Sequence, residues 1–177
     1  NECLNEININ MVSCGGQASI PMAVAISKTH SEIEYIEVVS SISSKSAGPA
    51  TRLNLDEYIK TTETGVEYFS GVKKTKAILV LNPAEPCINM ITTILAKVKQ
   101  PNIDALKLEV EKMSKKVQSY VPGYELILGP LFENGRILIM FKVIGLGDYL
   151  PEYAGNLDII NCAAIAMAEE YAARDKK

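Results

Sequence analysis

The sequence predicts an α+β domain in which helices cover one face of a mixed, mainly antiparallel sheet. Three observations lead to this class. Apolar runs with strand composition recur along the chain, residues 103–117 carry apolar side chains at helical spacing, and residues 124–144 alternate around a turn signal. A length of 177 residues with 47% hydrophobic content suits a single core, so we expect one domain over residues 1–177.

The first elements are expected on either side of Cys14. Residues 7–13 have the composition of a buried strand. The apolar residues that follow Cys14 at helical spacing predict a helix that ends near His30. A strand should come next over residues 32–43, with a slip in its alternation near Tyr35.

The middle of the chain is expected to hold a loop, a helix and two strands. Residues 43–52 predict a loop rich in Ser, Gly and Pro. Asn54, with acidic residues directly after it, is typical of a helix start, and this helix should run to about Phe69. Residues 76–81 predict a buried strand, and a further extended run covers about residues 88–98.

The clearest helix begins after Asn102, because apolar residues repeat there at alternating steps of three and four, with charged residues between them. Two alternating runs, 124–131 and 136–144, flank Glu133-Asn134-Gly135 and predict a hairpin. Residues 157–173 are apolar and rich in alanine, which predicts a last helix.

Composition excludes several function classes. A net charge of -3 and a pI near 5.3 give no electrostatic case for nucleic acid or an anionic membrane. The longest apolar run is too short to span a bilayer. The four cysteines are far apart, and a single histidine cannot build a multi-histidine metal site. We expect a reduced, cytoplasmic protein without a metal.

Cys14 is the candidate nucleophile. It stands where a helix begins, so unpaired backbone N–H groups and the positive end of the helix dipole should favour its thiolate over the thiol. Gly15, Gly16 and Gln17 are candidate donors to an oxyanion. A packed structural cysteine beside a tight turn is the alternative that these residues leave open. The cysteines without this position are expected to be inert: Cys3, Cys87 and Cys162.

Four other features have both a functional and a structural interpretation. Residues 43–52 can present amides and cations to an anion, or form an ordinary exposed loop. Asn156 can cap the last helix. Glu85, between two prolines, is predicted to be a turn carboxylate rather than a general base, and His30 to be an exposed histidine at a helix end.

Four segments carry a resemblance to a known family. They read NMVSCGGQASIP from Asn10, SISSKSAGPATR from Ser41, LNPAEP from Leu81 and YLPEYAGNLDI from Tyr149. In this order and at this spacing they resemble the acylating acetaldehyde dehydrogenases of bacterial aromatic-degradation pathways. The resemblance covers nearly the whole chain, and four motifs in register are far more specific than one.

The resemblance implies a fold like the C-terminal domain of glyceraldehyde-3-phosphate dehydrogenase and of aspartate-semialdehyde dehydrogenase. It implies that acetaldehyde, NAD and coenzyme A give acetyl-CoA and NADH through a thioester on Cys14. The chain departs from the family at Ala50, where glycine is usual, and at Ile91-Thr92, where an Arg-Asp pair provides an acid–base aspartate. The residues that match the family's NAD contacts are Lys45, Ser46, Ala47, Gly48, Pro49, Ala50, Thr51, Arg52, Leu53 and Asn156.

The resemblance also implies neighbours for this domain. No Gly-x-Gly-x-x-Gly follows a predicted strand. An N-terminal Rossmann domain is therefore expected before Asn1, with residues 157–175 packed against it, and this domain alone is expected to be inactive. The family implies a homodimer, and 4-hydroxy-2-oxovalerate aldolase as the partner that passes it acetaldehyde.

Two other functions fit the sequence. The chain could act only as a dimerisation and docking module that is catalytically silent without a Rossmann domain. It could also be a semialdehyde dehydrogenase of related fold. A charged semialdehyde requires an arginine for its carboxylate, and the arginines of this chain lie in no evident substrate motif: Arg52, Arg136 and Arg174.

Overall fold

The computed structural model describes residues 5–174, which contain one five-stranded sheet in the order β2-β1-β3-β5-β4. Strands β1 and β2 pair in parallel, and the three other pairs are antiparallel. The predicted mixed, mainly antiparallel sheet is therefore confirmed. The strands are β1 (Ile33–Ser43), β2 (Thr75–Asn82), β3 (Met90–Val98), β4 (Tyr124–Glu133) and β5 (Arg136–Val143).

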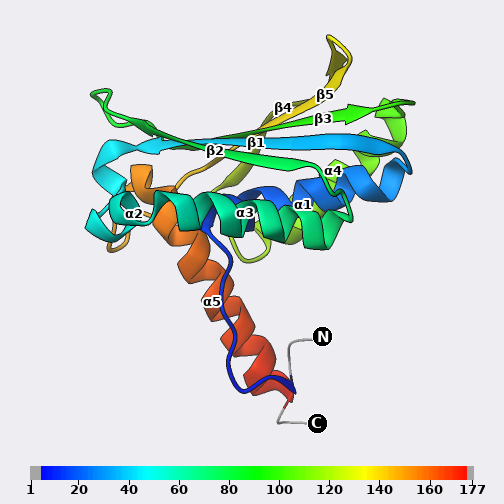
Figure 1. Ribbon diagram of the computed structural model, residues 1–177. Coiled ribbons are helices and arrows are strands. Elements are labelled where there is room, and N and C mark those ends of the chain that lie inside the picture. The colour runs from blue at the N-terminus through cyan, green and yellow to red at the C-terminus, as the bar shows by residue number, and fades with distance from the viewer. Residues whose placement is uncertain (1–4, 175–177) are drawn as a thin grey trace.

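Helices α1, α3 and α4 cover one face of this sheet, and no described helix covers the other face (Figure 1). Helix α5 begins beside the short helix α2 and extends away from the sheet (Figure 1). Two single turns, η2 (Ser44–Ser46) and η3 (Glu152–Ala154), precede α2 and α5. The helices are α1 (Cys14–Thr29), α2 (Pro49–Leu53), α3 (Leu55–Ser70), α4 (Ile103–Gln118) and α5 (Gly155–Arg174).

Helix α1 forms the centre of the helical layer. Its N-cap is Ser13, whose side chain accepts a hydrogen bond from the Gly16 N–H at 3.0 Å. Met22 and Ile26 are fully buried between the sheet and the neighbouring helices. The helix begins four residues before Ala18, the first residue of its apolar pattern, and this places Cys14 in its first turn.

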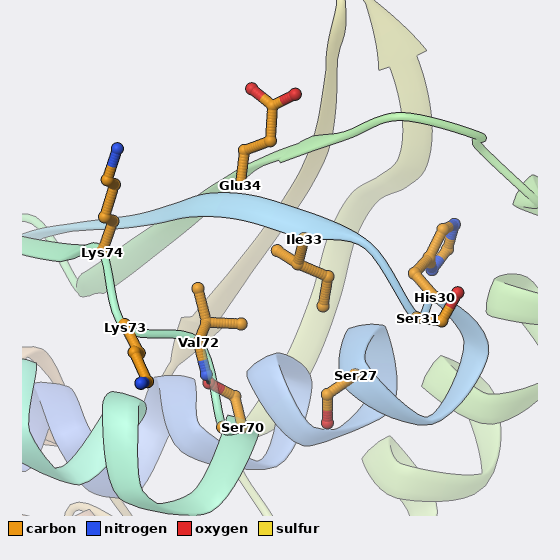
Figure 2. A pocket seen from close by; sticks show the side chains of 10 residues that line it. Ser27, His30, Ser31, Ile33, Glu34, Ser70, Val72, Lys73 and Lys74 are labelled. Carbon is orange, nitrogen blue, oxygen red and sulfur yellow. Dashed lines mark hydrogen bonds between the residues drawn. The ribbon is translucent and has the colours of Figure 1, made fainter.

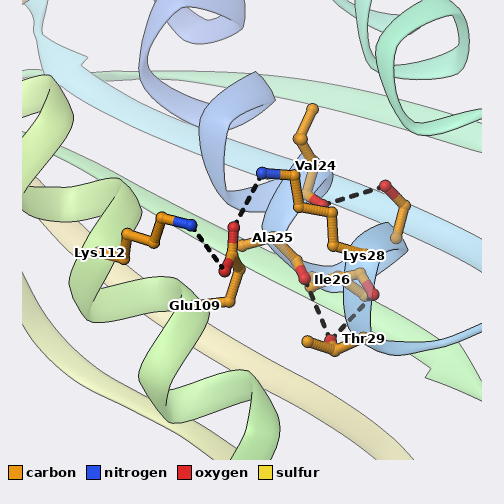
Figure 3. A network of polar contacts seen from close by, with 8 residues as sticks. Val24, Ala25, Ile26, Lys28, Thr29, Glu109 and Lys112 are labelled. Atoms are coloured by element: carbon orange, nitrogen blue, oxygen red, sulfur yellow. Dashed lines mark hydrogen bonds and ion pairs between the residues drawn. The ribbon is translucent and has the colours of Figure 1, made fainter.

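Helix α4 confirms the predicted amphipathic pattern. Its apolar stripe faces the core, with Leu106, Val110 and Val117 buried. On its outer side, the Glu109 carboxylate is 2.8 Å from Lys28 Nζ on α1 and 3.8 Å from Lys112 Nζ (Figure 3). These ion pairs connect two helices at the surface, where such contacts contribute little to stability.

The predicted hairpin and the slip in β1 are both confirmed. Asn134 and Gly135 join β4 to β5 with φ angles of 50° and 75°, the left-handed pair that a tight two-residue turn requires. The register between β1 and β3 shifts between Ile33 and Tyr35, where the alternation of β1 breaks.

The predicted strand over residues 7–13 is wrong. No strand forms there, and Ile7 is fully exposed. The segment instead runs beside the second half of α5, and the Tyr171 hydroxyl donates to the Glu6 carbonyl at 2.7 Å (Figure 1). An extended segment without a neighbouring strand has no ladder partner, whatever its composition.

Two predictions about the middle of the chain need correction. Residues 43–52 are not an irregular loop, because η2 and α2 occupy most of them. Strand β2 is an edge strand that pairs only with β1, and Ala77 is its one buried residue, so it is not a buried strand. Asn54 does stand at the N-cap of α3, but its side chain donates to the Ala50 carbonyl and does not cap the helix.

His30 is buried, contrary to the prediction of an exposed histidine. Its Nε2 accepts a hydrogen bond from the Asn102 N–H at 3.0 Å, and its Nδ1 lies 3.2 Å from the Ile26 carbonyl oxygen. Because Nε2 accepts, the ring proton belongs on Nδ1. The side chain thus joins the end of α1 to the start of α4, which is a structural role.

The central part of the uncovered face of the sheet is apolar. We define the outer sheet face by the half-buried residues Val39, Ile78, Leu95, Leu138 and Met140, whose strand register places them on the side away from the helices. Sheets with one solvated face normally alternate apolar and polar residues. Apolar residues at both alternations in its centre, bordered by charged residues such as Glu37 and Lys142, favour contact of this face with another protein surface. Within residues 5–174, no helix has the length and apolar content needed to cross a membrane.

Candidate functional site

Cys14 is the first residue of α1 and is 9% exposed. Its neighbourhood is built by three elements. Helix α1 supplies its first amides, α3 supplies Tyr58, and the end of β1 supplies Ser40, whose Oγ lies 3.2 Å from the point that a Cβ on Gly15 would occupy. The predicted position of Cys14 at the start of a helix is therefore confirmed.

The backbone donors near Cys14 are fewer than expected. The Gly16 amide already donates to Ser13 Oγ, and the Gln17 amide donates to the Ser13 carbonyl at 2.8 Å. The amides of Cys14 and Gly15 have no acceptor within the helix, and both lower the pKa of the Cys14 thiol. These two amides, and not that of Gly16, are available to an oxyanion. The Gln17 side chain donates weakly to Met11 Sδ at 3.9 Å.

Burial raises the pKa of Cys14 to about 11, which contradicts the expected preference for thiolate. The amides of Cys14 and Gly15 and the Tyr58 hydroxyl act in the opposite direction, but their combined effect is smaller than the cost of desolvating a thiolate. A helix terminus lowers a thiol pKa most when water or a cation helps to solvate the charge. Here Cys14 is only 9% exposed, and no charged side chain among the described residues shifts its pKa.

We therefore expect alkylation of Cys14 by iodoacetamide to accelerate about tenfold for each pH unit between pH 7 and 10, because only the thiolate reacts. In contrast to the inert behaviour expected from the sequence, the partly exposed Cys87 should be labelled before the buried Cys14 at neutral pH. Peptide mapping of a labelling series measures both rates. A Cys14 rate that reaches a plateau below pH 8 would contradict the burial effect.

The two glycines after Cys14 make room for neighbouring side chains. The Tyr58 hydroxyl occupies the place of a Cβ on Gly15, and the Val12 side chain lies 2.5 Å from the place of a Cβ on Gly16. Their immediate role is close packing of α1 against α3 and the preceding segment, in addition to any approach of substrate to the amides.

The structure brings Asn156 and the segment 45–53 together. The Asn156 side chain is 3% exposed, and its Nδ2 donates to the Ser46 carbonyl at 3.3 Å. This bond fixes which amide atom is oxygen, and the buried Oδ1 has no hydrogen-bond partner among the described residues. A buried acceptor without a donor is unusual in a folded protein and is a feature of ligand sites.

The charged side chains of this segment already have ion-pair or hydrogen-bond partners within the protein. Lys45 Nζ lies 2.5 Å from the Glu85 carboxylate, which raises the pKa of Lys45 and gives Glu85 a partner that sequence reasoning did not identify. Arg52 donates to the carbonyls of Ala47 and Ser44 at 3.0 and 2.9 Å and so braces the turn. The uncharged residues of the segment that are exposed are Gly48, Pro49, Ala50 and Leu53.

Sequence reasoning missed Tyr58 and Ser40, and it noted Thr92 only as a departure from the resembled family. Thr92, at the position where the resembled family carries aspartate, is fully buried, and its Oγ1 lies 3.0 Å from Ser40 Oγ. The residues are separated by at least 18 positions, and no local pattern marks them. Burial raises the pKa of the half-buried Cys162, while Cys3 lies outside the described residues.

The described clefts do not include Cys14. The cleft in Figure 2 has a volume of about 650 Å³ and is lined by His30 and Lys74 among others, at the far end of α1 and roughly 20 Å along the helix from Cys14. A larger, apolar cleft of about 820 Å³ lies between α1 and α5, and Gly16 and Gln17 line it. Residues 5–174 contain no group of three or more His, Cys, Asp or Glu that could hold a metal.

Comparisons with known proteins give one consistent result. Residues 14–151 match the family described as prokaryotic acetaldehyde dehydrogenase, dimerisation. The chain is 68% identical over 169 residues to an acetaldehyde dehydrogenase of Spirochaeta aurantia, covering 96% of this chain and 57% of that protein. Identity is 62% over 162 residues with the enzyme of Pectobacterium atrosepticum, covering 92% and 55%. With that of Geobacillus stearothermophilus it is 49% over 171 residues, covering 96% and 58%. The chain thus spans a little over half the length of these relatives.

Proposed function

Because this chain belongs to the prokaryotic acetaldehyde dehydrogenases and matches their dimerisation domain, we propose that it carries the thioester-forming cysteine of an acylating enzyme. In this proposal the full protein converts acetaldehyde, NAD and coenzyme A to acetyl-CoA, NADH and a proton. The observation that carries it is the position of Cys14 at the first turn of α1, beside two amides that have no acceptor within the helix.

The proposed chemistry uses these groups in order. The Cys14 thiolate adds to the aldehyde carbonyl, and the amides of Cys14 and Gly15 donate to the oxygen as it becomes an alkoxide. NAD, when bound, accepts the hydride that the tetrahedral carbon loses. The remaining acyl group is a thioester on Cys14. The thiolate of coenzyme A then displaces the Cys14 thiolate, which returns to its starting form.

The residues present fit NAD at one point. Asn156 Oδ1 is buried, lacks a donor and is held in place by the bond of its Nδ2 to Ser46. A carboxamide N–H of the nicotinamide is a suitable donor for this oxygen. Asn156 would thus hold that end of the cofactor, while the segment 45–53 would contact the rest of it.

The proposed assembly has two parts. A second copy of the chain covers the outer sheet face, in agreement with the dimerisation description of the matched family. The NAD-binding domain of the full protein packs on the second half of α5, where Ile165 is 59% exposed. On the resemblance alone, 4-hydroxy-2-oxovalerate aldolase is proposed as the partner that supplies acetaldehyde.

Acetyl-CoA offers a direct test, because the last step run in reverse needs neither NAD nor aldehyde. We expect the chain to take one acetyl group from acetyl-CoA onto Cys14, with release of free coenzyme A, faster as the pH rises toward the thiol pKa of about 11. Mass spectrometry of the intact chain and of its peptides measures the product. Cys14→Ser should abolish it.

Two results would contradict the proposal. Acetylation at Cys87 or Cys162 in place of Cys14 would show that Cys14 is not the cysteine that forms the thioester. A folded, self-associated chain that never becomes acetylated would favour the silent dimerisation and docking module. A semialdehyde substrate is disfavoured in addition by Arg52, whose guanidinium is occupied by the Ala47 and Ser44 carbonyls.

A further inference from the structure

The hydroxyl of Tyr58 is buried beside Cys14 and has no hydrogen bond of regular geometry with the described residues. Tyr58 lies in the first turn of α3. Its hydroxyl occupies the place of a Cβ on Gly15, and its ring carbon Cζ is 3.0 Å from that point. The phenol therefore lies directly over the backbone of the residue that follows Cys14.

Ser40 lies beside this phenol, because both hydroxyls are close to the place of a Cβ on Gly15. Ser40 is fully buried on β1, and its Oγ lies 3.0 Å from Thr92 Oγ1 on β3. The Ser40 hydroxyl lowers the pKa of Tyr58, which is the sign expected when Ser40 donates to the phenol oxygen. Thr92 can then donate to Ser40 in turn. The proton of the phenol is left for a different acceptor.

Cys14 directly precedes Gly15, the residue that the phenol covers, and its sulfur can serve as that acceptor. The groups that lower the pKa of Cys14 are its own amide, the Gly15 amide and the Tyr58 hydroxyl. No charged side chain among the described residues of α1, α3 or β1 shifts it, and the one histidine is at the opposite end of α1. Burial and the nearby thiol raise the pKa of Tyr58, so the phenol keeps its proton while Cys14 ionises.

We propose that Tyr58 is the side-chain hydrogen-bond donor that stabilises the Cys14 thiolate, and that the phenol proton gains an acceptor only when the thiol loses its own proton. A neutral phenol thereby takes the place that a cation fills in other thiolate sites. The same bond assists the step in which Cys14 leaves its thioester. This inference deepens the proposed function, since it rests on Cys14 being the nucleophile.

Removing the Tyr58 hydroxyl should change the reactivity of Cys14 without lowering stability, a result that a purely structural role of Tyr58 would not produce. In Tyr58→Phe, alkylation of Cys14 by iodoacetamide at pH 9 should slow by roughly tenfold or more, as expected for one lost hydrogen bond to a charged group. The rise of the rate with pH should shift to higher pH. The thermal unfolding midpoint should stay the same or increase, because the variant no longer buries an O–H group that has no acceptor.

Tyr124→Phe is the matched control. The Tyr124 hydroxyl is also buried against α1, but it donates to the Ala18 carbonyl at 3.0 Å. Its removal should lower the unfolding midpoint and leave the pH profile of Cys14 unchanged. Tyr58→Phe should therefore change the reactivity of Cys14 without loss of stability, whereas Tyr124→Phe should lower stability without changing that reactivity.

Two outcomes would overturn the inference. One is an unchanged pH profile of Cys14 in Tyr58→Phe. The other is slower alkylation in that variant together with a fall in midpoint like that of Tyr124→Phe, which would mean loss of packing. Alkylation needs neither aldehyde, NAD nor coenzyme A. A failure of acetyl transfer in the unchanged chain would therefore reject the proposed function and leave the result for Tyr58 standing.

Discussion

Replacing Leu138 by aspartate should convert the self-associated chain into a monomer. Leu138 lies on β5, with Leu95 of β3 on one side and Leu131 of β4 on the other in the strand register. A carboxylate at this position would have to be buried without a partner when a second copy covers the face, and such burial costs several kcal/mol. Sedimentation equilibrium at micromolar concentration measures the change of mass.

The size of the outer sheet face suits a dimer. Strands of eight to eleven residues give it a length of about 30 Å, and five strands give it a width of about 20 Å. Its flat area is therefore of the same order as the roughly 800 Å² that each partner buries in a stable interface. Twofold symmetry would place the same residues of both copies against each other.

Leu108→Asp provides the matched control for this variant. Leu108 is 72% exposed on α4, in the helical layer on the opposite side of the sheet. The same substitution there should leave the mass unchanged. A monomer mass for the unchanged chain would reject the dimer. Dissociation by Leu108→Asp in place of Leu138→Asp would move the interface to the helices.

The elements that could be predicted from the sequence are those whose cause is local. The stripe of α4 repeats within its own sixteen residues, and the Asn134-Gly135 turn requires two residues with positive φ. The register shift near Tyr35 is visible as a break in the alternation of one strand. Each of these patterns is complete within one element, so no knowledge of the partner is needed.

The errors have non-local causes. His30 is buried because the Asn102 amide, 72 positions away, donates to its ring. Residues 7–13 lack a strand because no neighbouring strand reaches them, and β2 is exposed because it lies at the edge of the sheet. Composition indicates which residues can form a strand, whereas the topology of the sheet determines whether a neighbouring strand is there to pair with them.

The candidate site shows the same difference between local and non-local causes. The position of Cys14 at a helix start is a local property and was predicted. Its pKa depends on how much protein surrounds the sulfur, and that surrounding comes from α3 and β1. The helix amides act as expected, but desolvation outweighs them. Tyr58 could not have been identified from the sequence, because 44 positions separate it from Cys14.

Gly15→Ala should destabilise the chain, although alanine is the better helix former. The gain in helix propensity is about 1 kcal/mol, whereas overpacking in a well-filled site costs about 1–3 kcal/mol. The added methyl group would meet the Tyr58 hydroxyl and would lie 3.2 Å from Ser40 Oγ. Both groups are buried, so neither can move freely. We expect a net loss of up to about 2 kcal/mol in the free energy of unfolding, measured by urea denaturation.

The double variant Gly15→Ala with Tyr58→Phe tests whether the Tyr58 hydroxyl is the group that obstructs the new methyl group. Without the hydroxyl, the nearest atom to the new methyl group is the ring carbon at 3.0 Å, so part of the lost stability should return and the two changes should not be additive. Gly48→Ala is the control, because a Cβ there meets nothing within 4 Å and the φ of -70° suits any residue. It should be neutral or slightly stabilising, since alanine restricts the unfolded chain. Full stability of Gly15→Ala, or no recovery in the double variant, would show that the Tyr58 hydroxyl does not lie against Gly15.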